Sequence, residues 1–309
     1  MKNCLCVVLF LLICFTRPSY AGLPAVPLKL HQALYVEGPE NNQPSGLTQW
    51  NGSLFTVSDK HDDTIFQLRL EQDRAAMVPF LSLDIPKPTE MSYTRDCDFE
   101  GITSNGTGTF FIVSEAFFRI LSVDSQDHSA SWITPSLKSK GKAAGLFRKN
   151  NAYFEGIAFT GPGTFILCAE RQPRGLVEVD TRFSPPAVTA YSSDSTRFHF
   201  KEGRSPDFSG LHWEQDRLYV LERNAYVVSR FSRNGERFVE GPGWSYRHIV
   251  MRPEYQYSDM KYGKAEGLCM DQQFIYIILD NNDIPRAADR TDRRPLLLIL
   301  KRPAQAQNS

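Results

Sequence analysis

The chain has 309 residues, with 35 lysine and arginine residues against 35 aspartate and glutamate residues, so its formal net charge is zero. This balance gives no support for a nucleic-acid partner, which requires a basic surface. Hydrophobic residues make up 41% of the chain, an ordinary share for a globular protein, and the length can bury a full core as one all-β domain.

The first segment has the pattern of a secretory signal peptide. Lys2 precedes the apolar run Cys4 to Phe15, and Ser19-Tyr20-Ala21 supplies the small residues that signal peptidase requires. We therefore expect residues 1–21 to be removed and residues 22–309 to form a single domain that is periplasmic or secreted. No later stretch approaches the roughly 20 apolar residues of a membrane span, so none is expected.

One motif recurs along the remaining chain: a small residue or glutamate, a glycine and an apolar residue, with an acid about 13 residues later. Its five copies run from Ser45-Gly46-Leu47 to Asp59, from Glu100-Gly101-Ile102 to Glu115, from Glu155-Gly156-Ile157 to Glu170, from Ser209-Gly210-Leu211 to Glu222, and from Glu266-Gly267-Leu268 to Asp280. The glycines are 54 to 57 residues apart. A period of this length is typical of a repeat architecture.

Each period reads as short strands divided by turns. In the second copy, strands are predicted over Gly101 to Ser104, Thr109 to Ser114 and Phe118 to Val123, with a tight turn at Asn105-Gly106-Thr107-Gly108. A fourth, less patterned strand should complete each unit, as at Met77 to Asp84 in the first copy. Four antiparallel strands per period are the sequence form of a β-propeller blade.

The two chain ends are expected to complete the fifth blade. Phe274 to Leu279 and Pro295 to Leu300 read as its second and third strands, and Leu28 to Val36 reads as the missing fourth. Pairing the ends would remove the exposed edges of an open ring. We therefore predict an all-β propeller of five four-stranded blades, closed by the N- and C-terminal strands. Six blades, one of them degenerate, are the alternative.

In such a ring, the first strand of each blade lines the channel and the second returns beside it. The residue that begins strand one should then lie opposite the acid that ends strand two, with all five pairs at one mouth of the channel. Eight of these ten positions are carboxylates, and like charges at this spacing raise one another's pKa unless a cation balances them.

A hard cation with oxygen ligands is the simplest balance, and Ca²⁺ tolerates such a ring better than Mg²⁺. No histidine or cysteine cluster has zinc-ligand spacing. The candidate metal ligands are Glu100, Glu155, Glu266, Asp59, Asp280 and Asn281. The acids after strand two could instead accept backbone hydrogen bonds or pair with an arginine of a neighbouring blade.

Basic residues follow several of these acids and could form a pocket for an anion. An ester bound there could be polarised by the metal acting as a Lewis acid. The candidate catalytic residues are His61, Arg171 and Arg223, and the candidate substrate-binding residues are Lys60, Arg119 and Arg174. His61 could act as a general base, or it could be an exposed loop histidine without a role.

Three cysteines lie beyond the signal segment, namely Cys97, Cys168 and Cys269. They could form one disulfide and one free thiol, or three buried thiols. Cys168 and Cys269 both lie within apolar strands of different repeats, which favours the buried thiols.

The motif blocks together resemble a known family. Val57-Ser58-Asp59-Lys60-His61-Asp62, Asp98-Phe99-Glu100-Gly101-Ile102, Phe154-Glu155-Gly156-Ile157 and Asp280-Asn281-Asn282 are similar to the phytase-like esterase domain family of exported bacterial β-propellers. The resemblance spans nearly the whole mature chain and implies a propeller with Ca²⁺-linked hydrolysis of a phosphate or carboxylic ester. More distantly, the acidic ring resembles that of calcium-dependent lactonase and arylesterase propellers, which have six blades.

Two functions therefore remain open. The first is an exported, metal-dependent hydrolase of a small anionic ester. The second is a propeller that binds an anionic ligand or a protein partner without turnover, its metal being structural. Fold alone cannot choose between them. We expect a monomer in either case.

Overall fold

The computed structural model describes residues 25–88, 96–200 and 203–304. The expected signal peptide lies outside these residues. No helix in the described ranges is long and apolar enough to cross a membrane.

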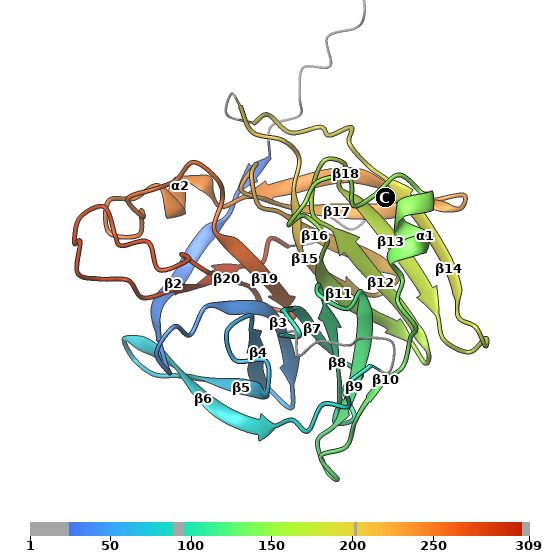
Figure 1. The fold of residues 1–309 in the computed structure, drawn as a ribbon. Coiled ribbons are helices and arrows are strands. Elements are labelled where there is room, and N and C mark those ends of the chain that lie inside the picture. Colours follow the sequence, from blue (N-terminus) through green and yellow to red (C-terminus); the bar gives the residue numbers. More distant parts are fainter. Residues whose placement is uncertain (1–24, 89–95, 201–202, 305–309) are drawn as a thin grey trace, which may run out of the picture.

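Five blades of four strands each surround a central axis (Figure 1). Blade 1 consists, from the axis outwards, of β3 (Pro44–Trp50), β4 (Ser53–Ser58), β5 (Thr64–Leu70) and β6 (Arg74–Ser82). Blade 2 consists of β7 (Phe99–Ser104), β8 (Thr109–Ser114), β9 (Arg119–Asp124) and β10 (Ala130–Trp132). Blade 3 consists of β11 (Phe154–Gly161), β12 (Thr164–Ala169), β13 (Gly175–Asp180) and β14 (Ala187–Ser192). Blade 4 consists of β15 (Phe208–Glu214), β16 (Arg217–Glu222), β17 (Val227–Asn234) and β18 (Arg237–Ser245).

Blade 5 is closed by the two chain ends, as predicted. Its inner strands are β19 (Ala265–Met270), β20 (Phe274–Leu279) and β21 (Leu296–Lys301), and β2 (Lys29–Glu37) is its outer strand. The end of β2 also runs parallel to the start of β6 and so joins blade 5 to blade 1.

The five-bladed ring is confirmed by the innermost strands, because β3, β7, β11, β15 and β19 each contact the next around the axis and β19 contacts β3 again. Smaller elements lie outside the blades: β1 (Val26–Pro27) runs parallel to the end of β18, and α1 (Lys138–Ala143) and α2 (Arg247–Val250) are single short helices.

The repeated glycines form a tight ring around the axis. A Cβ atom added to Gly101 would lie 2.4 Å from the carbonyl oxygen of Glu155, and one added to Gly156 would lie 2.9 Å from the backbone nitrogen of Leu211. One added to Gly267 would lie 2.5 Å from the carbonyl carbon of Gly46, which closes the circle. Real Cβ atoms do not approach backbone atoms so closely, so these positions accept only glycine. The period of the sequence is thus the spacing of blades packed backbone to backbone.

The predicted pairing of the first motif residue with the acid after strand two is wrong, because the acid lies opposite a residue one or two positions earlier in the first strand. In blade 2, Phe99 pairs with Ser114 and Gly101 pairs with Val113, so Glu100 is the extra residue of a β-bulge. Similar register shifts interrupt the first strand pairs of the other four blades. A bulge re-aims the side chain of its extra residue, and here it accompanies the motif glutamates.

The core lies between neighbouring blades, where the apolar faces of their sheets pack together. Cys97, Cys168 and Cys269 are all buried and free. The interpretation of three buried thiols is therefore confirmed. Burial raises the pKa of the Cys168 and Cys269 thiols to about 12.

Candidate functional site

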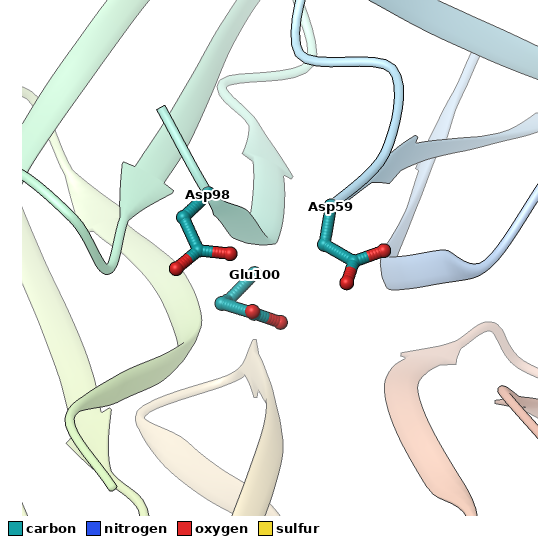
Figure 2. Close-up of side chains that lie close together, drawn as sticks. All are labelled: Asp59, Asp98 and Glu100. Carbon is teal, nitrogen blue, oxygen red and sulfur yellow. The ribbon is translucent and has the colours of Figure 1, made fainter. Parts of the chain in front are cut away.

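Three carboxylates converge at one mouth of the channel (Figure 2). Asp59 comes from the end of blade 1, and Asp98 and Glu100 come from the start of blade 2. One oxygen of each lies within 4.8 Å of the others, and all three side chains are half-buried. This spacing allows the three oxygens to contact one cation.

The backbone that carries Asp98 is held by a neighbouring carboxylate. Asp62 accepts hydrogen bonds from the backbone N–H groups of Cys97 at 2.5 Å and of Asp98 at 3.3 Å. The Glu115 N–H donates to the Asp98 carbonyl at 2.9 Å, and Asp98 itself has a φ of 55°. Aspartate tolerates this left-handed conformation better than most residues. The turn before β7 is thus fixed in the form that presents Asp98 beside Glu100.

The electrostatics of this cluster are those of an unbalanced acidic site. Burial, followed by repulsion from Glu115, Asp59 and Asp98, raises the pKa of Glu100 well above its usual range. Burial also raises the pKa of Asp59, against the lowering effect of Lys60. Burial raises the pKa of Asp62 to about 6. A cation placed among these oxygens would favour the charged forms.

A hollow of about 590 Å³ opens over the cluster. It is lined by residues 59–63 together with Asp96 and Asp98, so five carboxylates face one lysine and one histidine. Lys60 Nζ lies 2.6 Å from Asp59 Oδ2. His61 Nε2 lies 2.9 Å from the carbonyl oxygen of Glu40. Because a carbonyl can only accept, Nε2 is the donor in this contact, and in the neutral ring Nδ1 is then the acceptor.

The opposite side of the mouth is organised around Arg223. Its Nη1 atom donates to Glu266 Oε1 at 2.6 Å, and its Nη2 atom contacts Glu170. Nη2 also lies 3.1 Å from Asp207 Oδ1 and 3.7 Å from Glu155 Oε1. One buried guanidinium therefore joins carboxylates from blades 3, 4 and 5.

Burial still raises the pKa of Glu155 and Glu266, although Arg223 acts to lower both. The acids of the two sides also influence each other, because Glu100 and Glu266 each contribute to the raised pKa of Glu155. The motif glutamates of blades 2, 3 and 5 are thus close enough to influence one another's charge.

Asp280 belongs to the same mouth, whereas the amide nitrogen of Asn281 is hydrogen-bonded within the loop that follows. Burial, with repulsion from Glu266 and Asp59, raises the pKa of Asp280 to about 7. The Asn281 amide Nδ2 donates to the carbonyl oxygens of Ile284 and Arg293, at 2.7 and 2.8 Å. Asn281 therefore holds the long loop between β20 and β21.

The remaining basic residues that the sequence suggested lie in different environments. Arg171 pairs with Glu170 and donates to the Asn151 carbonyl at 3.1 Å, at the rim of the mouth. Arg119 begins β9 and is half-buried. Arg174 is completely buried, so it is not placed to contact a ligand. Its guanidinium contacts Glu222, lies 3.0 Å from Glu240 Oε1 and stacks on the ring of Phe208.

Several carboxylates of the mouth were not among the predicted site residues, and two of them share a sequence pattern. They are Asp98 and Asp207, and each precedes a phenylalanine and the motif residue in its copy, as Asp98-Phe99-Glu100 and Asp207-Phe208-Ser209. An Asp-Phe pair at the same phase of two repeats is a signal that sequence reasoning could have used. In blade 4, Asp207 supplies the carboxylate that the serine of the motif lacks.

These features define a five-bladed β-propeller whose channel mouth holds a carboxylate ring, with one side bridged by arginine and the other open to an acidic hollow. The family model described as SdiA-regulated matches residues 32–282. The chain belongs to the SdiA-regulated family. The resemblance to phytase-like esterase propellers is thereby supported at the coarser level of a β-propeller family.

Several solved structures are similar to this chain at low sequence identity. A glutaminyl cyclase from Myxococcus xanthus is 12% identical with a TM-score of 0.52, and the match covers 89% of this chain and 97% of the other. An aldose sugar dehydrogenase from Streptomyces coelicolor, in its PQQ-bound form, is 12% identical with a TM-score of 0.48, covering 90% and 99%. A calcium-binding protein, regucalcin, from Agrobacterium tumefaciens is 12% identical with a TM-score of 0.47, covering 90% and 97%. No curated protein matches the sequence.

Proposed function

We propose that this protein is an exported, cation-dependent hydrolase of a phosphate or carboxylic ester, and that Ca²⁺ is its cation. The observation that carries the proposal is the convergence of Asp59, Asp98 and Glu100 oxygens within 4.8 Å of one another. Carboxylate oxygens are the ligands that Ca²⁺ prefers, and the rest of its coordination can be water and substrate.

The charge of the hollow explains why a cation is needed. Five carboxylates against Lys60 and His61 would repel an anionic ester. A bound cation would reverse this local field and would polarise the carbonyl or phosphoryl oxygen of the ester. Lys60 lies at the rim, where its ammonium can orient the anion.

His61 is placed to handle a proton in the same hollow. Its Nε2–H is occupied by the Glu40 carbonyl, which fixes the ring orientation. The free Nδ1 can accept a proton from a water molecule that attacks the ester. His61 is the general base of this proposal.

A specific observation favours the second candidate, a binding protein without turnover. The guanidinium groups of Arg223 and Arg171, which the sequence offered as catalytic residues, already contact carboxylates, so they are not free to stabilise the charge that develops on a reacting ester. In that case the cation would be structural, and the hollow would bind its ligand without chemistry.

Assays of p-nitrophenyl esters and p-nitrophenyl phosphate in Ca²⁺ or EDTA would separate the two candidates. The hydrolase predicts turnover that EDTA abolishes and that falls at least about 100-fold in His61→Gln, the usual weight of a general base. Asp98→Asn should lose both turnover and Ca²⁺ binding, whereas Asp96→Asn, an exposed residue of the same hollow, should retain both. Ca²⁺ binding that depends on Asp98, without turnover of any ester, would support the binding protein instead.

The proposal includes export and a monomeric state. N-terminal sequencing of protein recovered from a periplasmic or culture fraction should begin at Gly22, and light scattering should give one chain per particle. An N-terminus at Met1 would contradict export.

A further inference from the structure

On the side of the mouth formed by blades 3 to 5, the positive charge is supplied by a side chain of the protein, Arg223. Arg223 is 8% exposed, and its two terminal nitrogens reach Glu266, Glu170, Asp207 and Glu155. Charge-assisted contacts of this kind are the strongest hydrogen bonds of a protein interior.

The position of Arg223 is fixed by its backbone as well as by its charge. Its N–H donates to the Asp207 carbonyl at 3.0 Å, and its carbonyl accepts from the Tyr226 N–H at 3.3 Å. Gly263 lies so close that an added Cβ atom would be 2.1 Å from the Arg223 carbonyl oxygen. The guanidinium therefore enters the ring from a rigid turn.

The other side is dominated by acids. Lys60 pairs with Asp59 from the rim, and the oxygens of Asp59, Asp98 and Glu100 lie within 4.8 Å of one another. Among the described residues, Asp59 Oδ1 is buried here without a hydrogen-bond partner, as are Glu170 Oε2, Asp207 Oδ1 and Arg223 Nε on the other side. The ring is thus divided into a side that holds a buried guanidinium and a side where three acids converge beside a lysine at the rim.

We propose that Arg223 is the built-in counter-cation of the ring and a positioning residue that restricts the mouth to one divalent ion, bound by Asp59, Asp98 and Glu100. The location of that single ion rests on the proposed function. The inference adds that the acids of blades 3 to 5 form a second, latent cation site whose place the guanidinium occupies. Removing Arg223 would leave Glu155, Asp207 and Glu266 for a divalent ion to bridge, whereas Glu170 also pairs with Arg171.

Calorimetric titration with Ca²⁺ and luminescence titration with Tb³⁺ test whether Arg223 occupies a second cation site. The native chain should bind one ion, and Arg223→Gln should bind two. Its melting temperature should also rise much more steeply with Ca²⁺ than that of the native protein, because an ion that binds the folded state stabilises it by mass action. Arg286→Gln is the matched control, since Arg286 is also buried but donates to the backbone carbonyls of Tyr255 and Arg294 and lies 3.8 Å from Asp292. It should still bind one ion.

The outcomes distinguish this inference from the proposed function. One ion in both the native chain and Arg223→Gln would overturn the inference and leave the proposed site intact. No ion in the native chain but one in Arg223→Gln would overturn the proposed site and support the counter-cation.

Arg223→Gln could also fail to fold without an ion, because breaking a buried ion pair leaves uncompensated charge. It should then be rescued by millimolar Ca²⁺. The triple variant Arg223→Gln/Asp207→Asn/Glu266→Gln, which removes most of that charge, should fold without Ca²⁺ and bind one ion. A triple variant that folds while Arg223→Gln stays unfolded in Ca²⁺ would refute the counter-cation.

Discussion

Individual carboxylates at the channel mouth carry a stability penalty that depends on pH. A carboxyl group whose pKa is higher in the folded state than in the unfolded chain holds its proton longer in the folded state. Its contribution to the stability of the fold is favourable below the pKa of the unfolded chain, which is about 4.3 for glutamate and about 3.9 for aspartate. This contribution is lost as pH rises through the pKa of the folded state. Glu100, Glu155 and Asp280 all behave in this way.

Glu100→Gln should therefore raise the melting temperature by a few degrees at pH 8 in EDTA and leave it unchanged at pH 4. In saturating Ca²⁺ the order should reverse, because the native side chain is then a ligand. Thermal unfolding followed by circular dichroism measures both effects, and Glu236→Gln, at an exposed position, is the control. A variant that is less stable in EDTA at pH 8 would contradict the repulsion.

His212 has the opposite dependence on pH. Its buried Nε2 atom has no hydrogen-bond partner among the residues that the structure describes, and burial lowers the pKa of His212 to about 4. Because an unfolded histidine titrates at about 6.5, the unfolded chain binds the proton first as pH falls. Stability linked to His212 is complete above pH 6.5 and is lost between about 6.5 and 4.

The loss of unfolding free energy linked to His212 should approach about 3 kcal/mol at pH 4, since each pKa unit corresponds to about 1.4 kcal/mol. His212→Gln should flatten that part of the pH profile of urea unfolding. His199→Gln changes an exposed histidine and should reproduce the native profile. An unchanged slope in His212→Gln would show that other groups cause the acid sensitivity.

At the scale of the strand, the glycine ring and the bulges beside it determine how closely the blades approach. Gly101→Ala should destabilise the protein by at least about 1–3 kcal/mol, the usual cost of overpacking, because its Cβ would meet the backbone oxygen of Glu155. Gly161→Ala is the control, since the nearest atom is the Thr164 hydroxyl at 3.3 Å. Chemical denaturation of both variants provides the comparison, and equal losses would argue against a special role for the ring.

The same elements show what the sequence could and could not predict. The regular spacing of Gly46, Gly101, Gly156, Gly210 and Gly267 predicted the blades, because each repeat makes the same local structure. The β-bulge at Glu100 was not predicted, since its extra residue is defined by hydrogen bonds between two strands and not by residue type.

The site was predictable only as a set of acids at one mouth. That Arg223 bridges three blades depends on residues far apart in the chain, such as Glu155 and Glu266. That Arg174 is buried depends on the neighbouring Glu222 and Glu240. Both arginines follow strand-two acids in sequence, so local pattern could not tell a rim cation from a core ion pair.

For the whole molecule, the N-terminal strand is the closing element. Leu34 in β2 is 1% exposed and packs with Leu297 and with residues of blade 1. Leu34→Ala should lower the free energy of unfolding by about 2–5 kcal/mol, in a single transition seen by both circular dichroism and tryptophan fluorescence. Lys29→Ala, at the exposed start of β2, should have little effect. Two separate transitions in Leu34→Ala would mean that the closing blade detaches on its own.

The pairing of Lys29 with Lys301 also has a consequence for synthesis. A chain leaving the ribosome carries β2 from the start, yet β2 finds its main partner only when β21 has emerged. Contacts of such high sequence separation form slowly, so the first strand must wait through the synthesis of the other blades with an unpaired edge. The native ring can therefore close only at the end of translation. Incomplete chains should be the species that chaperones and proteases encounter.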